Sequence, residues 1–546
     1  MFFKSNIMLS MSIMFMIISS TLLFNNMFIS IEIPMLLTFY SYMNISINID
    51  WLSSLFLATV LFISAMIIKF SHSYISSLQH NLFINLMLMF ILSMSLLIMS
   101  DNIIFILLGW DGLGLSSYIL VVYYQNASSS ASGSITILSN RVGDIMILMS
   151  IATMFYMINW NFSMNEKFNL IIMVMLMIAA MSKSAQFPFS AWLPAAMSAP
   201  TPISALVHSS TLVTAGVYLL IRIMNFNHPM CSYFLMLISS FTAIYASMAA
   251  MWEQDMKKII ALSTLSQMAM MMYAISLNAI NVAYFHLISH ALFKSMMFLC
   301  AGILIHNFMY QDMRHMGSMI NNSPTIISML GISNMSLMGI PFMSGFFSKD
   351  SIIEKMILSN FSMIISFIMI LSISMTSLYS FRLINITSKF VMKSKTDMTI
   401  MPNNIMENST IKMAMFSMMF GSMYMWIYSP NQLFIIPNYM KMLILISLLM
   451  GILLSMSFSF KNNMYQKLGQ PAISLWFTHM MSSNSLFNMN KYMKQSHNND
   501  KLWQESYGPY NTFNYIMLSS NTPNMIMMSS MCLILLSMII PIMLLM

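Results

Sequence analysis

Stretches of about 18–24 predominantly apolar residues recur along almost the whole chain, and they constrain its fold more than any other feature. A helix of that length crosses a hydrocarbon layer of roughly 30 Å. Hydrophobic residues make up 58% of the sequence and charged residues only 7%, against roughly a quarter in soluble proteins. A β-barrel would instead show short alternating segments. We therefore expect an all-α polytopic membrane protein.

The apolar stretches predict about fifteen transmembrane helices. The first lacks a small-residue cleavage site, so we expect a span there and not a signal peptide. Lysine and arginine are concentrated in the N-terminal tail and the even-numbered connections, which places the N-terminus and residues 460–524 on the matrix-like side. The predicted spans are residues 7–24, 53–70, 82–99, 102–122, 135–158, 169–185, 202–224, 233–251, 257–278, 281–303, 324–342, 361–386, 411–428, 439–459 and 525–546.

Methionine is unusually frequent, with 74 residues in a chain of 546. Packing does not explain this excess, because methionine specifies a core poorly. A genome rich in A+T that reads AUA as methionine would produce it, which indicates an invertebrate mitochondrial gene. An A+T-rich bacterium would explain the frequent asparagine and isoleucine but not the methionine.

The sequence contains no recognisable motif for binding a metal or a redox cofactor. Cys231, Cys300 and Cys532 are scattered and form no CxxC motif or Cys/His cluster. The GLGL stretch at 112–115 lacks the third glycine and the acidic residue of a dinucleotide fold. We expect no metal site and no cofactor in this chain, so that any redox chemistry takes place in another subunit.

Two of the predicted spans, the sixth and the eleventh, are interrupted by proline or glycine. Residues 182–202 contain four prolines and Lys183, and residues 339–351 contain Pro341, Gly345 and Lys349. Because the spans are five apart, two five-helix units in series would run in opposite directions through the membrane. Paired broken helices are typical of inverted-repeat transporters, whose sites lie at the breaks. The plainer alternative is proline that merely kinks a helix.

Ten ionisable residues fall inside or at the ends of the apolar spans. A charge at the bilayer centre costs roughly 2.5–3.5 kcal/mol on insertion scales, so such residues face the bundle interior or water and usually pair. They are the candidate functional residues: Asp111, Arg141, Asp144, Lys183, His208, His286, His290, Lys294, Lys349 and Asp350.

The stretch YFHLISHALFK places His286, His290 and Lys294 at i, i+4 and i+8. These positions form one stripe on a helix with steps of about 6 Å. Imidazoles exchange protons near neutral pH, and a buried ammonium group releases its proton more readily than an exposed one. The stripe therefore predicts a proton wire. The alternative for each histidine is a hydrogen-bonded core residue.

The remaining charges suggest local pairs. Asp111 lies mid-span, where coupling to a nearby lysine could act as a proton switch. Arg141 and Asp144, at i and i+3, predict a salt bridge that helps a helix insert. Asp350 is either the partner of Lys349 or a group at the channel mouth. The hydroxyl groups around His208 either hold waters or satisfy the ring.

These motifs resemble the antiporter-like family of membrane subunits found in mitochondrial NADH:ubiquinone oxidoreductase (respiratory complex I) and in Mrp cation/proton antiporters. The stretches that carry the resemblance are LLGWDGLGLSSY, SNRVGDI, SKSAQFPFSAWLPAAMSAPTPISALVHSSTLVTAGVYLL, KKIIALSTLSQ, FHLISHALFKSMMFLCAG and GIPFMSGFFSKDSI. Residues 460–546 resemble a lateral helix and an anchoring helix that distinguish one branch of the family from relatives that lack them.

The resemblance implies proton translocation across the mitochondrial inner membrane, driven by quinone reduction in other subunits. It implies that Asp111 and Lys183 form the first station, that Lys294 is the central lysine, and that Lys349 is the exit-side lysine. His208, His286 and His290 would line the connecting water chain, with Arg141, Asp144 and Asp350 supporting it. Asp111 replaces the more usual glutamate, so its contact with Lys183 is expected to need a water.

The implied partners are the other membrane subunits of complex I, especially antiporter-like subunit 4 and supernumerary subunits, with phospholipids including cardiolipin as further candidates and no nucleic acid. FMN, Fe–S clusters and ubiquinone are expected in partner subunits. A stand-alone or Mrp-type monovalent cation/proton antiporter subunit is the alternative function.

The expected organisation of the chain is N-terminal helices at 1–100, two five-helix repeats at 101–251 and 252–390, further helices at 391–460, a lateral amphipathic segment at 461–524 and an anchoring helix at 525–546.

Overall fold

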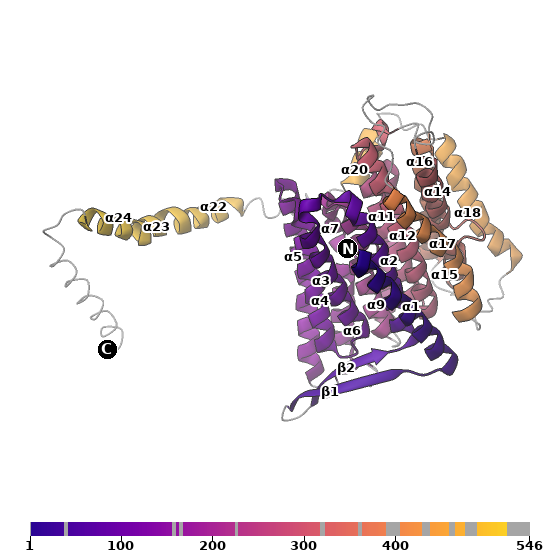
Figure 1. Cartoon of the computed structure of the whole chain (residues 1–546), viewed down its shortest axis with the longest axis horizontal. Coiled ribbons are helices and arrows are strands. Elements are labelled where there is room, and N and C mark those ends of the chain that lie inside the picture. Colours follow the sequence, from indigo (N-terminus) through magenta and orange to yellow (C-terminus); the bar gives the residue numbers. More distant parts are fainter. Residues whose placement is uncertain are drawn as a thin grey trace. The chain divides into compact units, whose positions relative to one another are not determined.

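A computed structural model of the chain describes most of its residues (Figure 1). It divides into two units, Met1–Leu475 and Trp476–Met546, which are described separately. The described residues are 2–37, 42–155, 160–162, 168–223, 228–316, 323–358, 363–388, 404–428, 437–457, 465–474 and 489–520.

The first unit is a bundle of helices, and each of the first fourteen predicted spans overlaps one or more of them. Among the described residues, ten helices are long and apolar enough to cross a membrane, which confirms a polytopic helical membrane protein. The fifteenth predicted span, 525–546, lies outside the described residues. The ten helices are α1 (Phe2–Asn25), α2 (Trp51–Tyr74), α3 (His80–Met99), α4 (Ile103–Val121), α5 (Ala127–Met154), α9 (Leu212–Ile223, preceded by α8, Thr201–Ile203, and a π-helical segment, Ser204–Thr211), α10 (Pro229–Trp252), α11 (Met256–Ser276), α12 (Ile280–Phe308) and α16 (Met363–Ser388). Two further helices of the bundle are α17 (Asn404–Tyr428) and α18 (Asn438–Ser457).

Both predicted breaks are present. Helix α6 (Leu170–Lys183) ends after 14 residues and is followed by short helical turns that include α7 (Trp192–Ala195). Helix α14 (Pro324–Met338) ends at Gly339, whose φ of 84° lies in the left-handed region, and α15 (Ser344–Leu358) begins after Pro341. Proline cannot continue a helix and glycine takes a left-handed cap without strain, so these residues end the helices early.

One element was not predicted. Strands β1 (Ile29–Leu37) and β2 (Tyr42–Ile49) form an antiparallel hairpin with an irregularity between Pro34 and Leu36. The hairpin lies at the end of the bundle where α1 ends and α2 begins (Figure 1). Its signal was the alternation of isoleucine with polar residues in ISIEI and NISINI, which is typical of strands.

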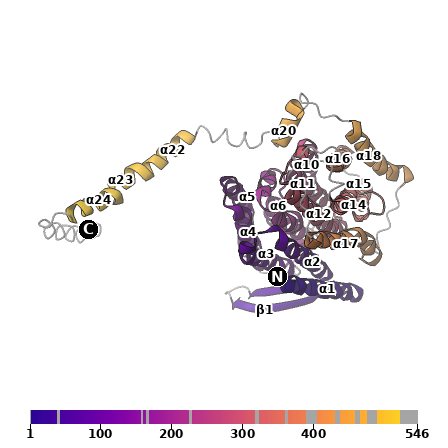
Figure 2. The same cartoon turned by 45° about the horizontal axis from the view of Figure 1, so that its top comes forward.

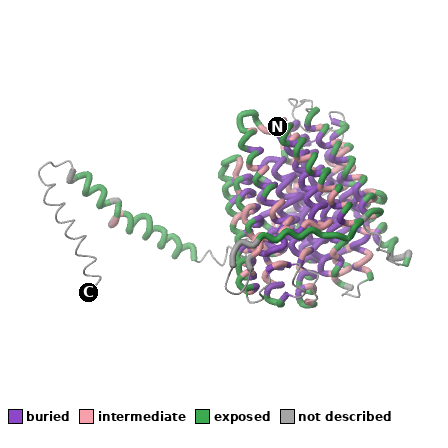
Figure 3. Tube along the Cα trace, turned by 60° about the horizontal axis from the view of Figure 1, so that its bottom comes forward, coloured by how far each residue is buried: buried purple, intermediate pink, exposed green. Residues whose placement is uncertain are grey.

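The middle of the bundle is formed by α11 and α12, whose most apolar windows are completely buried. Helix α12 packs against α2, α11, α14, α15 and α17, and Figure 2 shows it among them. Buried positions accordingly fill the interior of the first unit (Figure 3). Every side chain on α12 between Val282 and Ile305 is therefore surrounded by protein.

The second unit contains most of residues 461–524, which were predicted to be a lateral amphipathic segment. Its described part is helical through α22 (Asn490–Asn498), a π-helical segment (Asn499–Gln504), α23 (Glu505–Tyr507) and α24 (Pro509–Ser520). The helix is interrupted at Gly508, directly before Pro509, as the composition indicated. In the first unit, α20 (Gln470–Ile473) follows the helical turn Tyr465–Gly469.

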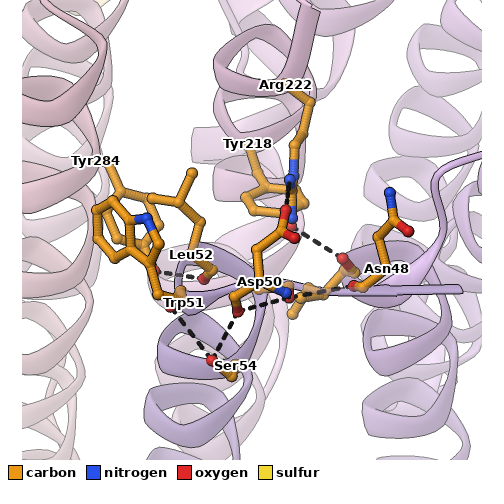
Figure 4. Close-up of polar contacts among 10 residues, drawn as sticks. Asn48, Asp50, Trp51, Leu52, Ser54, Tyr218, Arg222 and Tyr284 are labelled. Atoms are coloured by element: carbon orange, nitrogen blue, oxygen red, sulfur yellow. Dashed lines mark hydrogen bonds and ion pairs between the residues drawn. The ribbon is translucent and has the colours of Figure 1, made fainter. Parts of the chain in front are cut away.

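An ion pair fixes the hairpin end of the bundle (Figure 4). Asp50 caps α2 in a reciprocal capping box with Ser53, and its carboxylate also accepts a hydrogen bond from Arg222 at the end of α9. The Arg222 Nε donates to the Tyr218 hydroxyl at 3.0 Å, and that hydroxyl donates to the Ile98 carbonyl of α3 at 2.9 Å. The starts and ends of α2, α3 and α9 are thus tied together.

We expect the substitution Arg222→Leu to destabilise the chain by about 2–3 kcal/mol, because it removes charge-assisted hydrogen bonds and leaves a half-buried carboxylate without its partner. Thermal unfolding of the purified assembly measures the effect. Arg314→Leu is the matched control, since Arg314 pairs with Asp312 at the surface, where such pairs contribute less than about 1 kcal/mol. Equal losses in both variants would contradict the assigned role.

Candidate functional site

Six of the ten candidate residues are almost completely buried in the first unit. Lys183, His286, His290 and Lys294 have 0% exposure, His208 has 1% and Lys349 has 2%. A soluble or a membrane protein rarely buries such groups without polar partners. Their partners define the site.

Lys183 is the last residue of α6 and reaches across to α4. Its Nζ donates a hydrogen bond to the Trp110 carbonyl at 3.2 Å and lies 5.0 Å from the centre of the indole ring. Gly114 of α4 lies beside it, and a Cβ there would stand in ordinary contact with Nζ, at 3.6 Å. The broken helix therefore delivers an ammonium group to the backbone next to Asp111.

Asp111 is closest to Arg141. Nη1 of Arg141 lies 3.9 Å from Asp111 Oδ1 and 3.2 Å from Asp144 Oδ2, which confirms the salt bridge predicted for Arg141 and Asp144. Among the described ion pairs, none joins Asp111 to Lys183. Both aspartates keep one buried carboxylate oxygen that has no described hydrogen-bond partner.

The predicted stripe on α12 faces polar side chains of α11 and α15. His286 Nδ1 is 2.9 Å from Ser348 Oγ, and its Nε2 is 3.2 Å from Gln267 Oε1. The rings of His286 and His290 are 6.2 Å apart, close to the step of about 6 Å that the spacing predicts. Lys294 Nζ donates to Ser263 Oγ of α11.

Lys349 connects this stripe to the second broken helix. The last carbonyls of a helix have no intrahelical donor, and at the end of α14 the Leu337 carbonyl accepts a hydrogen bond from Lys349 Nζ. The neighbouring Ser348 also accepts a hydrogen bond from Ser289 of α12 at 3.2 Å. Lys349 therefore caps the C-terminal end of α14, while the adjacent Ser348 contacts α12 at His286 and Ser289.

His208 lies in the π-helical segment before α9. Neither of its ring nitrogens has a described hydrogen-bond partner. The hydroxyls of Ser209, Ser210 and Thr211 bond to carbonyls of their own helix, so they do not satisfy the ring, as one sequence-based alternative had proposed. Asp350 follows Lys349 and lies within electrostatic range of Glu354 and Lys441.

Several polar residues of the site were not among the candidates. They were not predicted from the sequence, and each has at most 1% exposure: Ser263, Gln267, Ser348 and Asn334. Gln267 Nε2, both His290 nitrogens and both side-chain polar atoms of Asn334 have no described partner. Each of them is a polar residue in an apolar span, which could have indicated a site. Serine is so common in the apolar spans of this chain, however, that its presence alone does not identify a site residue.

Within the described parts of the chain, no group of three or more His, Cys, Asp or Glu side chains could hold a metal ion. The buried groups of the site are instead lysines, histidines and neutral hydrogen-bonding side chains. Such groups bind, donate and pass protons.

Comparisons with known proteins agree with this arrangement. Residues 100–376 match the family described as NADH:quinone oxidoreductase/Mrp antiporter, TM, and residues 379–546 match NADH dehydrogenase subunit 5 C-terminus. NADH-ubiquinone oxidoreductase chain 5 of Lumbricus terrestris is 40% identical over 94% of this chain and 93% of its own. Chain 5 of Aedes aegypti is 42% identical over 80% of this chain and 78% of its own.

A solved structure of an Mrp complex from Dietzia sp. DQ12-45-1b contains a similar fold, with a TM-score of 0.77 and 21% identity over 90% of this chain and 57% of that one. Fold and site thus define an antiporter-like, multi-pass membrane protein of a class without redox cofactors of its own. Within that class, the chain belongs to the NADH-ubiquinone oxidoreductase chain 5 family.

We expect Gly345→Ala to distort the second broken helix, because an added Cβ would lie 1.8 Å from the Ser336 carbonyl oxygen. Overpacking of this kind costs about 1–3 kcal/mol, and it would move Lys349 and Ser348. Proton pumping and thermal stability of the assembled complex both report on the change.

Gly331→Ala, also in α14, is the control, because no atom lies within 4 Å of a Cβ at that position. We expect that variant to be neutral or more stable by up to about 1 kcal/mol. A stable, fully active Gly345→Ala variant would show that the close approach of α14 and α15 does not position the lysine.

Proposed function

We propose that the buried row of polar residues in the first unit is the path along which this chain moves protons. The chain is a membrane subunit of NADH:ubiquinone oxidoreductase (respiratory complex I) and takes part in proton translocation across the mitochondrial inner membrane. The observation that carries the proposal is that lysines and histidines with 0–2% exposure occur on α6, in the π-helical segment before α9, on α12 and on α15.

The first station is Lys183 together with Asp111. The ammonium group lies against α4 at the Trp110 carbonyl, while Asp111 is held by Arg141. A water that joins the Asp111 carboxylate to Lys183 would couple the two groups. A change in that coupling favours or disfavours the charged lysine, because an opposite charge nearby stabilises it.

The second part of the path runs along α12. Lys294 and His286 are each held by a side chain of α11, Ser263 and Gln267 respectively, and His290 stands between them in the sequence. Proton transfer between lysine, imidazole and hydroxyl groups over such distances proceeds through single intervening waters. Lys349 follows through Ser348 and is the last lysine of the row.

Unsatisfied hydrogen-bonding capacity supports a hydrated path. Buried polar atoms are almost always hydrogen-bonded, either to protein or to ordered water. In the described part of the chain, His208, His290, Gln267 and Asn334 have polar atoms without a protein partner, and all four are at most 1% exposed. Waters that satisfy these atoms would extend the row from α9 to α14.

We extend the proposal to the architecture. Fifteen spans would consist of the helices described here together with the segment 525–546. Residues 101–251 and 252–390 would be two five-helix units of opposite orientation, each with one broken helix and one buried lysine beside it. The two breaks and their lysines support this division.

We expect Lys294→Met to abolish coupled proton pumping and to impair or uncouple NADH oxidation by the complex, because methionine fills the space of lysine but carries no proton. The proton-to-electron ratio of the complex reconstituted in vesicles measures this. Lys467→Met removes an exposed lysine and should leave the ratio unchanged. An unchanged proton-to-electron ratio in Lys294→Met would contradict a role of Lys294 in proton transfer.

We also propose that a neighbouring membrane subunit covers the outer face of α5. The side chain of Arg141 is 49% exposed in the isolated chain and lies halfway along α5, between the exposed Leu138 and Ile145. Contact of a guanidinium with lipid at this depth costs roughly 2.5–3.5 kcal/mol. A polar surface on a partner subunit removes this cost.

A nitroxide label at Leu138→Cys should collide rarely with dissolved oxygen in the intact complex, because a partner covers the face. A label at Leu453→Cys on α18, also exposed in the chain, is expected to keep the high collision rate of a lipid-facing site. Power-saturation EPR gives both rates. Equally high rates would mean that α5 faces lipid.

A further inference from the structure

A cavity of about 480 Å³ lies between α1, α2, α12 and α17, away from the proton path. Helix α2 packs against both α1 and α17, and Figure 2 shows the three close together. Residues from all four helices line the cavity, among them Leu9, Thr59, Phe62, Leu292, Lys412 and Phe416.

The walls of the cavity are effectively apolar. Three hydroxyl groups in the lining, those of Ser12, Ser20 and Thr59, donate to carbonyls of their own helices at 2.7–2.8 Å. They do not need a partner in the cavity. Because the remaining wall is aliphatic or aromatic apart from Lys412, the cavity favours a hydrocarbon occupant.

The dimensions of the cavity select the kind of hydrocarbon. The lining of α1 runs from Leu9 to Ser20, a rise of about 16 Å, which is roughly half of the hydrocarbon core of a bilayer. A volume of about 480 Å³ over this length gives a mean cross-section of about 30 Å². This long, narrow shape suits a single extended acyl chain.

One end of the cavity carries positive charge. Lys412 lines it, and Lys69 follows Met66 on the face of α2 that also presents Phe62 and Thr59. The two ammonium groups are close enough to repel each other. Neither lysine belongs to an ion pair among the described residues, so the two charges lack a protein counter-ion.

The charged end lies away from the hairpin. Lys69 is near the end of α2 that is distant from Asp50. Tyr424 of α17 stacks on Phe285, and the neighbouring Tyr284 packs on Trp51 at the hairpin end, so Lys412, twelve residues before Tyr424, also lies toward the opposite end. By the distribution of lysine and arginine, this end faces the matrix side.

We propose that this cavity is a binding site for an anionic phospholipid of the matrix leaflet. One acyl chain lies along α1 between α2 and α17, and the lipid phosphate lies between Lys69 and Lys412. The apolar wall recognises the chain and the two unpaired ammonium groups recognise the phosphate. This site is independent of the proton path.

The test is native mass spectrometry of the detergent-purified complex with added phosphatidylglycerol. In the double variant Lys69→Gln/Lys412→Gln, we expect phosphatidylglycerol to bind roughly 30-fold more weakly, since each lysine near a lipid surface contributes about 1 kcal/mol. Lys467→Gln removes an exposed lysine elsewhere and should bind like the unchanged complex. Unchanged binding by the double variant would overturn the proposal.

A second variant tests the chain-binding wall without touching a charge. Ile13 lines the cavity but is 52% exposed, so Ile13→Trp fills the cavity without disturbing the core. We expect it to lose the bound phosphatidylglycerol as well. Retention of the lipid by this variant, equal binding of phosphatidylcholine, or cross-linking of the cavity lining to a partner polypeptide would each count against the site.

Discussion

The cost of placing ammonium and imidazole groups in an apolar medium organises this structure. Lysine and histidine at the middle of a helical bundle are stabilised where hydroxyl, amide or carbonyl oxygens, or ordered waters, meet them. The chain supplies these oxygens from neighbouring helices: Ser263 for Lys294, Ser348 and Gln267 for His286, and main-chain carbonyls for Lys183 and Lys349. The position of the central helices follows from these pairings.

The broken helices meet the same requirement. An intact helix uses its carbonyls internally, whereas a helix that ends within the bundle leaves its last carbonyls free. Lys349 uses one of them at the end of α14. Lys183, placed at the end of α6, instead crosses to the surface of α4, where its ammonium group donates to the Trp110 carbonyl. The two breaks thus serve their lysines in different ways.

Much of the site could be predicted from residue type and spacing. His286 and His290 have the predicted separation, and Arg141 pairs with Asp144. The hydroxyl and amide partners could not be predicted, because a serine or glutamine in an apolar span has no periodicity that distinguishes a partner from a neutral neighbour. The hairpin at residues 29–49 was missed since its alternation is short and lies between two strong helix signals.

By itself, the sequence determined that this chain crosses a membrane many times, that two of its helices are interrupted, and which charged groups stand within the apolar segments. The length of an apolar segment, the position of a proline or glycine, and the presence of a charge in an apolar segment are local properties, so they can be identified from the sequence alone. Only the tertiary structure decided which oxygen each charge meets, that Asp111 lies by Arg141 and that Lys183 reaches the Trp110 carbonyl. Those contacts join residues dozens of positions apart, and their geometry is set by the packing of whole helices, which no local pattern records.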